Sequence, residues 1–433
     1  MKVWATAAAA VVALFFLYFF GLARTGLLSA DEPRYASIGR EMAQSGDWIT
    51  PRLNGQPWYE KPALLYWMTA IGFDLGLGDE LAPRLPVATV SVAFLVFFFF
   101  FLKREFGLMP AAMATCILAT SAGWLAFSHI AVTDLPMSAA FGSAMLLAMN
   151  KTGRWILLPV LFLGLAVLAK GLVPLVLFLP AIWFLRRRAI WIIGGAILVA
   201  LPWYVAVGPD FAREFFWKHH FQRFATGALA HVRPFWFYIP VLVAGIFPWT
   251  PALALLFRRD FYKDWRIQFF GAWFAFGFLF FSISQNKLPG YLLPLLPPIA
   301  AMCGIALARA RAPWVLAISA ALLWLIPAIQ EILPQALNSG LSHTHLQLPY
   351  LFLIPALALA VLCWFVRPQV AVAAISVVVT FAIIRVVWIT FPVLDNEVSA
   401  RPHVDSITCS SNPNRSWRYG LDYYAHRPIP DCK

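Results

Sequence analysis

The chain has 433 residues, of which 61% are hydrophobic and 12% are charged, and its mean hydropathy is +0.74. Soluble globular domains contain roughly 45–50% apolar and about 25% charged residues, so the composition excludes a soluble globular protein. The formal net charge of +13 is spread over short loops between apolar runs rather than along one stripe, which excludes an extended nucleic-acid-binding surface.

Apolar runs recur along almost the whole chain, and many approach the roughly 20 residues with which a helix crosses a membrane. The first run is longer than the apolar core of a usual signal peptide, which favours a retained first helix. The sequence therefore predicts an all-α polytopic membrane protein with thirteen crossings, at residues 3–22, 85–102, 110–127, 135–149, 155–168, 172–185, 190–207, 235–257, 269–283, 292–308, 314–332, 350–365 and 371–388.

The basic residues predict the orientation of these crossings. Lysines and arginines fall in alternate loops, and the positive-inside rule places those loops in the cytoplasm. The N-terminus is then cytoplasmic and the C-terminus extracytoplasmic. We expect a membrane domain over residues 1–390, with a first outer loop at 23–84, and a short outer C-terminal segment at 391–433.

One pair of runs is too short to cross the membrane fully. Residues 155–185 leave about 15 residues for each arm of a hairpin, or roughly 22 Å, against a hydrocarbon core of about 30 Å. We therefore expect the turn at Lys170 and Gly171 to lie below the outer membrane surface, where a lysine needs water or an anionic partner. The alternative is one long tilted helix in which the Lys170 side chain extends to the membrane surface, but that would place Arg186, Arg187 and Arg188 outside.

Carboxylates are scarce and are concentrated in the first outer loop. There, Asp31 and Glu32 precede an amphipathic segment that predicts a helix closed by Gly46. Capping that helix requires only one of the two acids, so the other is a candidate for chemistry. Asp134 is the only acid between residues 105 and 210, and it either serves the reaction or caps the helix that follows it.

Several segments resemble one family, in order along the chain. They are DEPRYASIGREMAQSGDW and NGQPWYEKPALLYW in the first outer loop, followed by APRLPVA, AVTDLPM, LAKGLVP, HHFQRF, PFWFYIPVLVAGIFPW and SQNKLPGYLLPLLPP. Together they resemble the bacterial aminoarabinose transferases and the protein O-mannosyltransferase-like glycosyltransferases of the GT-C fold. The resemblance implies a multi-pass protein of the bacterial inner membrane with a periplasmic active site.

The family's chemistry implies roles for particular residues. It transfers a sugar, with inversion, from a polyprenyl-phosphate carrier to an acceptor, which requires a base and cations for the leaving phosphate. Asp31 matches the family's catalytic acid, with Glu32 and Asp134 as further catalytic candidates. The resemblance assigns the donor and its phosphate to Arg34, Tyr59, Lys61, Lys170, Lys287 and Tyr291. Ordinary structural roles compete, such as a lysine that extends to the membrane surface at Lys61.

The resemblance also suggests a divalent metal, Zn or Mg. Glu60 and Asp134 correspond to acidic positions associated with metal binding, and His219 or His220 would add a nitrogen ligand. These residues are dispersed, so their spacing alone proves nothing. The sequence contains no P-loop and no dinucleotide-binding glycine motif, which fits a lipid-linked donor better than a nucleotide sugar.

The C-terminal segment departs from the family. Relatives often carry a substantial domain after the last helix, whereas this chain ends soon after it, in a segment where Cys409 and Cys432 would form a disulfide in an oxidising compartment. The acceptor is therefore open: lipid A, lipopolysaccharide or another glycolipid is favoured over protein. A transporter or flippase of lipid-linked substrates is the alternative function.

Overall fold

Helices make up nearly all of this computed structural model, which describes residues 2–150, 156–215, 232–310, 312–340, 344, 347–411 and 414–432. The first half contains α1 (Lys2–Tyr18), α2 (Asp31–Ser45), α3 (Leu64–Asp74), α4 (Gly78–Phe106), α5 (Leu108–Ala119), α6 (Ala122–Ser128), α7 (Asp134–Ala148), α8 (Leu157–Lys170), α9 (Val173–Leu177), α10 (Pro180–Leu185), α11 (Arg187–Ala206) and α12 (Pro209–Ala212).

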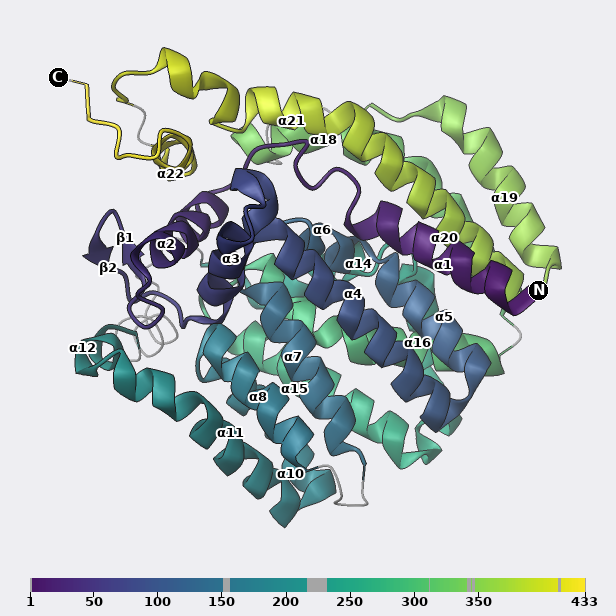
Figure 1. Ribbon diagram of the computed structural model, residues 1–433. Helices are drawn as coiled ribbons and strands as arrows, with labels where there is room; N and C mark the ends of the chain where they lie inside the picture. Colours follow the sequence, from purple (N-terminus) through teal and green to yellow (C-terminus); the bar gives the residue numbers. More distant parts are fainter. Residues whose placement is uncertain are drawn as a thin grey trace.

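The second half adds α14 (Tyr238–Gly245), α15 (Trp265–Ile283), α16 (Leu296–Arg309), α17 (Pro313–Leu322), α18 (Ile326–Ser339), α19 (Leu353–Phe365), α20 (Pro368–Arg385), α21 (Phe391–Glu397) and α22 (Arg415–Tyr424). Short 3-10 or π turns join them: η2 (Phe235–Phe237), η3 (Thr250–Phe257), η4 (Arg259–Lys263), η5 (Pro289–Leu295), η6 (Leu323–Leu325), η8 (Tyr350–Phe352), η9 (Val386–Thr390) and η10 (Arg401–Ser406). Figure 1 shows the helices as one bundle, with α2, α3 and α22 together at one end.

Six helical stretches in the described part of the chain are long and apolar enough to cross a membrane, or eight if each of two bent pairs is one span. Four shorter apolar helices of 10–17 residues coincide with further predicted runs. Large apolar side chains also stay exposed on outer helices, as at Trp183, Trp191 and Phe365, which suits a lipid-facing surface. The protein is therefore a multi-pass membrane protein, while the count of thirteen crossings stays a prediction.

The predicted hairpin after residue 155 is present. Helix α8 ends at Lys170, and Gly171 follows in a left-handed conformation with φ of 73°. The chain then returns through α9 and α10, and the guanidinium of Arg188 donates to the backbone carbonyl of Asn150. That bond places the end of the hairpin beside its start. The alternative of one long helix is wrong because the backbone reverses at Gly171.

Helix α2 forms where the sequence predicted it and ends at Gly46, whose φ is 69°. It is largely buried against α3 and α22, rather than lying on the surface of the bundle (Figure 1). Its N-cap residue is Ala30, and no side chain caps it, so the expectation that Asp31 or Glu32 serves as the cap is wrong. After α2, a turn at Asn54 and Gly55 joins β1 (Arg52–Leu53) to β2 (Gln56–Pro57), the only ribbon in the described residues.

A fully buried ion pair joins α2 to α4. Glu32 is 0% exposed and its two oxygens accept from Arg84 Nε at 2.7 Å and Nη2 at 2.9 Å. The same carboxylate accepts from the backbone N–H of Leu28 at 2.7 Å and of Ala131 at 2.9 Å. The remaining N–H groups of Arg84 donate to backbone carbonyls between α1 and α2, at Leu22, Thr25 and Gly26. One pair thus fixes four separate segments.

We predict that Arg84→Ala lowers the free energy of unfolding by about 3–5 kcal/mol, because it leaves the Glu32 carboxylate buried and unpaired. The check is thermal unfolding of purified protein in detergent. Arg104→Ala is the control, because Arg104 pairs with Glu105 at an exposed position, where such pairs contribute about 0–1 kcal/mol. Equal unfolding temperatures for the two variants would contradict the prediction.

Candidate functional site

Arg34 lies at the centre of the first charged cluster. Its Nη2 donates to Asp31 Oδ1 at 2.5 Å and lies 3.1 Å from Glu60 Oε2, while Lys61 Nζ is 3.7 Å from Glu60 Oε1. Asp31 and Arg34 lie on α2, whereas Glu60 and Lys61 lie in the segment after β2. Two carboxylates and two cations therefore meet at one place, and three of them, Asp31, Arg34 and Lys61, are site residues proposed from the sequence.

The carboxylates of Asp31, Glu60 and Glu32 differ in the exposed fraction of their side chains, and so in whether a substrate can contact them. The Asp31 side chain is 48% exposed, whereas that of Glu60 is 14% exposed and Glu32 is fully buried. All four hydrogen bonds to Glu32 come from the protein itself, so its role in this structure is to hold segments together. Asp31 is therefore the acid in this cluster that is best placed to meet an acceptor.

Burial also controls the protonation of the groups in this cluster. Burial raises the pKa of the Tyr35 phenol well above its ordinary value, so this ring neighbour of Arg34 stays neutral. Burial alone would lower the pKa of Arg34, but the charges around it, including Glu60 and Asp31, raise it overall. The guanidinium therefore keeps its charge inside the protein.

A second ion pair forms between Asp134 and Lys170. Lys170 Nζ donates to Asp134 Oδ1 at 2.5 Å and lies 4.8 Å from the centre of the Tyr291 ring. Helix α7 begins at Asp134 without any side-chain cap, so the alternative that Asp134 caps it is wrong. The anionic partner that the sequence predicted for Lys170 is thus present.

Packing brings the two clusters to the same end of the molecule. Tyr59 and Leu64, on either side of Lys61, pack against an apolar cluster that contains Val167 and Leu168, just before Lys170. The Tyr59 ring lies edge-on to Phe211, with the ring centres 5.6 Å apart. Tyr59 thus fills this apolar cluster in the structure, and its predicted contact with the donor stays a prediction.

Lys287 is the fourth cation that the resemblance assigned to the donor. Its ammonium donates to the backbone carbonyls of Ser284 and of Arg233, the latter at 3.1 Å. Burial lowers the pKa of Lys287. In this arrangement Lys287 closes the turn between α15 and η5 and so helps to place Tyr291 next to Lys170.

No group of three metal-binding side chains occurs among the residues that the structure describes. Within that part, Glu60 contacts Arg34 and Lys61, and Asp134 contacts Lys170, so both carboxylates already neutralise cations. The carboxylates alone do not form a metal site. His219 and His220 lie outside the described residues, so the predicted metal stays a prediction.

A largely apolar cavity of 740 Å³ lies beside the buried Glu32–Arg84 pair. Its wall contains Leu28, Ser29 and Arg84, next to the buried ion pair, and apolar residues of α6, α18, α20 and α21. The C-terminal segment contributes Asn414, Ser416 and Trp417. The cavity has the size and lining that an apolar chain requires.

Sequence reasoning did not identify three residues of the site: Arg84, Trp58 and Tyr419. Arg84 lies in α4 directly before its long apolar run, and a charge at that place is a signal that it has a partner in the bundle. The aromatic side chains of Trp58 and Tyr419 lie against Arg34, with ring centres 5.5 and 5.4 Å from Cζ. Nothing local in the sequence links residue 419 to residue 34.

The family model for dolichyl-phosphate-mannose-protein mannosyltransferases matches residues 3–226. This match covers more than half of the chain, and the protein belongs to that family.

Curated relatives are aminoarabinose transferases. The chain is 34% identical over 324 residues to undecaprenyl phosphate-alpha-4-amino-4-deoxy-L-arabinose arabinosyl transferase 2 of Pseudomonas fluorescens, covering 67% of this chain and 57% of that protein. It is 37% identical over 321 residues to the corresponding transferase of Edwardsiella ictaluri, covering 66% and 57%. The aligned part therefore spans somewhat more than half the length of these relatives.

Solved structures show the same fold. The crystal structure of ArnT from Cupriavidus metallidurans bound to undecaprenyl phosphate gives a TM-score of 0.79 at 24% identity, covering 99% of this chain and 86% of that one. An oligosaccharyltransferase from Archaeoglobus fulgidus gives 0.53 at 14% identity, covering 98% and 64%. The fold is thus the GT-C fold, as the sequence predicted.

The close approach of η5 to Asp134 leads to a prediction. A Cβ at Gly290 would lie 2.6 Å from Asp134 Oδ1 and 2.8 Å from the Phe127 ring. We expect Gly290→Ala to lower the free energy of unfolding by about 1–3 kcal/mol, measured by thermal unfolding in detergent. Gly194→Ala is the control, because a Cβ there meets nothing within 4 Å. An unchanged unfolding temperature in Gly290→Ala would contradict the close packing of η5 against Asp134 and Phe127.

Proposed function

We propose that the protein is an inverting glycosyltransferase that moves a sugar from a polyprenyl-phosphate carrier to a hydroxyl or phosphate of an envelope acceptor. The observation that carries the proposal is the half-exposed Asp31 beside the cations Arg34 and Lys61, with a third cation, Lys170, at the same end. The names of the curated relatives, which specify undecaprenyl phosphate and an arabinosyl transfer, support this donor class.

In this reaction Asp31 takes the proton from the acceptor as the acceptor oxygen bonds to the anomeric carbon. The bond between that carbon and the phosphate oxygen breaks at the same time, which inverts the configuration. The negative charge that develops on the leaving polyprenyl phosphate is stabilised by Lys61, Lys170 and Arg34. A lysine has three N–H donors, so Lys170 can contact Asp134 and a phosphate together.

The lipid-linked donor and a lipid acceptor also fit the apolar surroundings. The 740 Å³ cavity adjoins the Glu32–Arg84 pair and is lined mainly by apolar side chains, which suits an acyl or prenyl chain. We therefore favour lipid A, lipopolysaccharide or another glycolipid over a protein acceptor. No nucleic acid is expected as a partner.

We place the site on the periplasmic side of a bacterial inner membrane, with a cytoplasmic N-terminus and a periplasmic C-terminus. The pairing of Cys409 with Cys432 supports this orientation, because disulfides form in oxidising compartments such as the periplasm. The distribution of the basic residues supports it as well, because lysines and arginines such as Arg104, Arg188 and Arg266 fall in the alternate loops that the positive-inside rule places in the cytoplasm.

We predict that Asp31→Asn reduces sugar transfer by roughly 10²- to 10⁴-fold, because the amide cannot accept the acceptor's proton. The measurement is the transfer of label from isotopically labelled undecaprenyl-phosphate sugars to an envelope extract by purified protein in detergent. Asp260→Asn is the matched control, because Asp260 is exposed and pairs only with Lys263 among the described residues.

The outcomes of this transfer measurement distinguish a glycosyltransferase from a transporter or flippase, and test Asp31 as the base. Equal transfer by Asp31→Asn and wild type would exclude Asp31 as the base and direct attention to Asp134. Folded wild-type protein that transfers from no donor would favour the transporter or flippase. The labelled product would identify the acceptor.

The metal has its own test. If Glu60 or Asp134 binds Zn or Mg together with His219 or His220, elemental analysis will find a stoichiometric metal that is lost in His219→Ala/His220→Ala. Chelator-treated protein that contains no metal and still transfers sugar at the wild-type rate would contradict this prediction.

A further inference from the structure

The C-terminal helix α22 is held against the first outer loop by several hydrogen bonds. Tyr423 Oη donates to the carbonyl of Asp79 at 2.7 Å, and Arg40 Nη2 donates to the carbonyl of Tyr423 at 2.8 Å. The N–H of Leu27 donates to Tyr424 Oη at 2.7 Å. Figure 1 shows α22 beside α2, although the two helices are far apart in the sequence.

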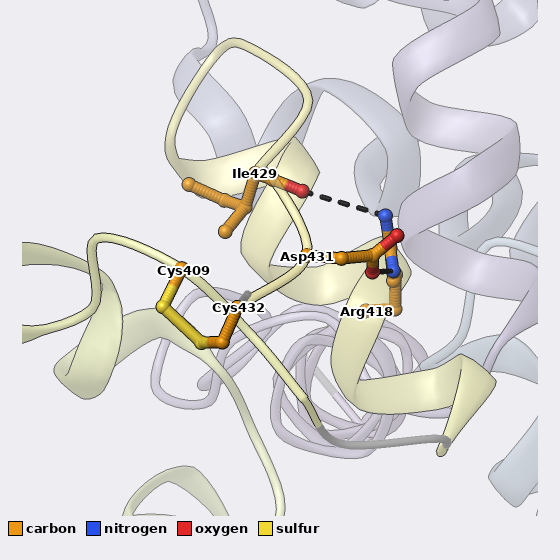
Figure 2. Close-up of a disulfide and its surroundings, with 5 residues drawn as sticks. All are labelled: Cys409, Arg418, Ile429, Asp431 and Cys432. Carbon is orange, nitrogen blue, oxygen red and sulfur yellow. Dashed lines mark hydrogen bonds and ion pairs between the residues drawn. A yellow bond between two sulfur atoms is a disulfide. The ribbon is translucent and has the colours of Figure 1, made fainter.

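The chain on both sides of α22 is closed into a loop. Cys409 and Cys432 form a disulfide, with Cα atoms 4.9 Å apart (Figure 2). Arg418, within α22, pairs with Asp431, and the N–H of Ile429 donates to Asp422 Oδ1 at 2.8 Å. The disulfide and these contacts restrict how far α22 can move from α2.

One side chain of α22 reaches the proposed active site. The Tyr419 ring centre lies 5.4 Å from Arg34 Cζ, and Tyr35 and Trp58 contact the same guanidinium with ring centres at 5.1 and 5.5 Å. Arg34 is almost fully buried, and its Nε has no hydrogen-bond partner within the described structure. Cation–π contacts with these three aromatic rings therefore help to stabilise the buried charge of Arg34.

The same tyrosine also lies near a second cation. Arg415 Cζ lies 5.8 Å from the Tyr419 ring centre, and Arg415 is exposed. Tyr419 thus contacts both a buried and an exposed guanidinium. Of the three rings around Arg34, it is the one supplied by the C-terminal segment.

We propose that Tyr419 is a positioning residue, and that the disulfide-closed C-terminal segment is part of the active site. By packing on Arg34, Tyr419 fixes the guanidinium that orients Asp31 and faces the leaving phosphate. Tyr419 itself takes no part in bond making. This inference rests on the proposed function, and it makes turnover depend on the Cys409–Cys432 bond.

The test compares Tyr419→Leu with Tyr419→Phe in the full-length protein. Loss of the ring is expected to lower kcat roughly 3- to 30-fold, the range of a desolvated cation–π contact, with the acceptor KM unchanged. Tyr419→Phe should retain wild-type kcat because it keeps the ring. Tyr350→Leu, at an exposed tyrosine far from α22 in the sequence, is the matched control.

Other kinetic outcomes would overturn the inference. A raised acceptor KM with unchanged kcat would make Tyr419 an acceptor contact instead. Equal losses in the leucine and phenylalanine variants, together with lowered unfolding temperatures in both, would reduce Tyr419 to a structural residue.

Removing the disulfide provides a second, independent test of the proposal. Cys409→Ser/Cys432→Ser is expected to lower kcat in the same direction, and adding Tyr419→Leu should cost less than the product of the two separate losses. Fully multiplicative losses would show that the disulfide does not act through Tyr419.

A binding measurement separates failure of this inference from failure of the proposed function. Undecaprenyl phosphate should raise the unfolding temperature of the wild type, and Tyr419→Leu should need about 3- to 30-fold more of it for the same shift. If the wild type binds this lipid but transfers no sugar, only the proposed function fails. Identical binding curves for the wild type and Tyr419→Leu would overturn the inference.

Discussion

The buried Glu32–Arg84 pair is the constraint on which the rest of the structure depends. All five N–H donors of the guanidinium are used, and the carboxylate accepts four hydrogen bonds. A pair so deeply buried persists only with this degree of satisfaction, because desolvating two charges costs several kcal/mol each. By joining the start of α2 to α4 and to the segment before α7, it sets where Asp31 and Asp134 stand relative to the bundle.

The site itself is a set of opposite charges in an apolar protein. Arg34 and Lys61 lie against Asp31 and Glu60, and Lys170 lies against Asp134, so each cluster is formally neutral. Neutral clusters are less costly to bury than single charges. A lysine or arginine side chain carries several N–H donors, so a cation that pairs with a carboxylate can also contact a phosphate.

A disulfide and hydrogen bonds hold the C-terminal segment around α22 in one position against the bundle. It has too few residues to build a large core of its own, and the Cys409–Cys432 bond closes a loop that limits the conformations of the unfolded chain. Its docking uses Tyr423, Tyr424 and Arg40, residues with both apolar surface and hydrogen-bonding atoms. The same helix then faces Arg34 on one side and the apolar cavity on another.

The sequence by itself determined the membrane class, the helical runs, the break at Gly171 and the end of α2 at Gly46, because hydropathy, loop charge and glycine conformation are local properties. The family motifs also brought Asp31, Arg34, Lys61, Asp134 and Lys170 forward as one set. Only the tertiary structure decided that Glu32 is buried by Arg84, that Asp134 pairs with Lys170 instead of capping α7, and that Tyr419 packs on Arg34. Each of these depends on a contact between residues distant in the chain, and such a contact leaves no periodicity or spacing in the sequence.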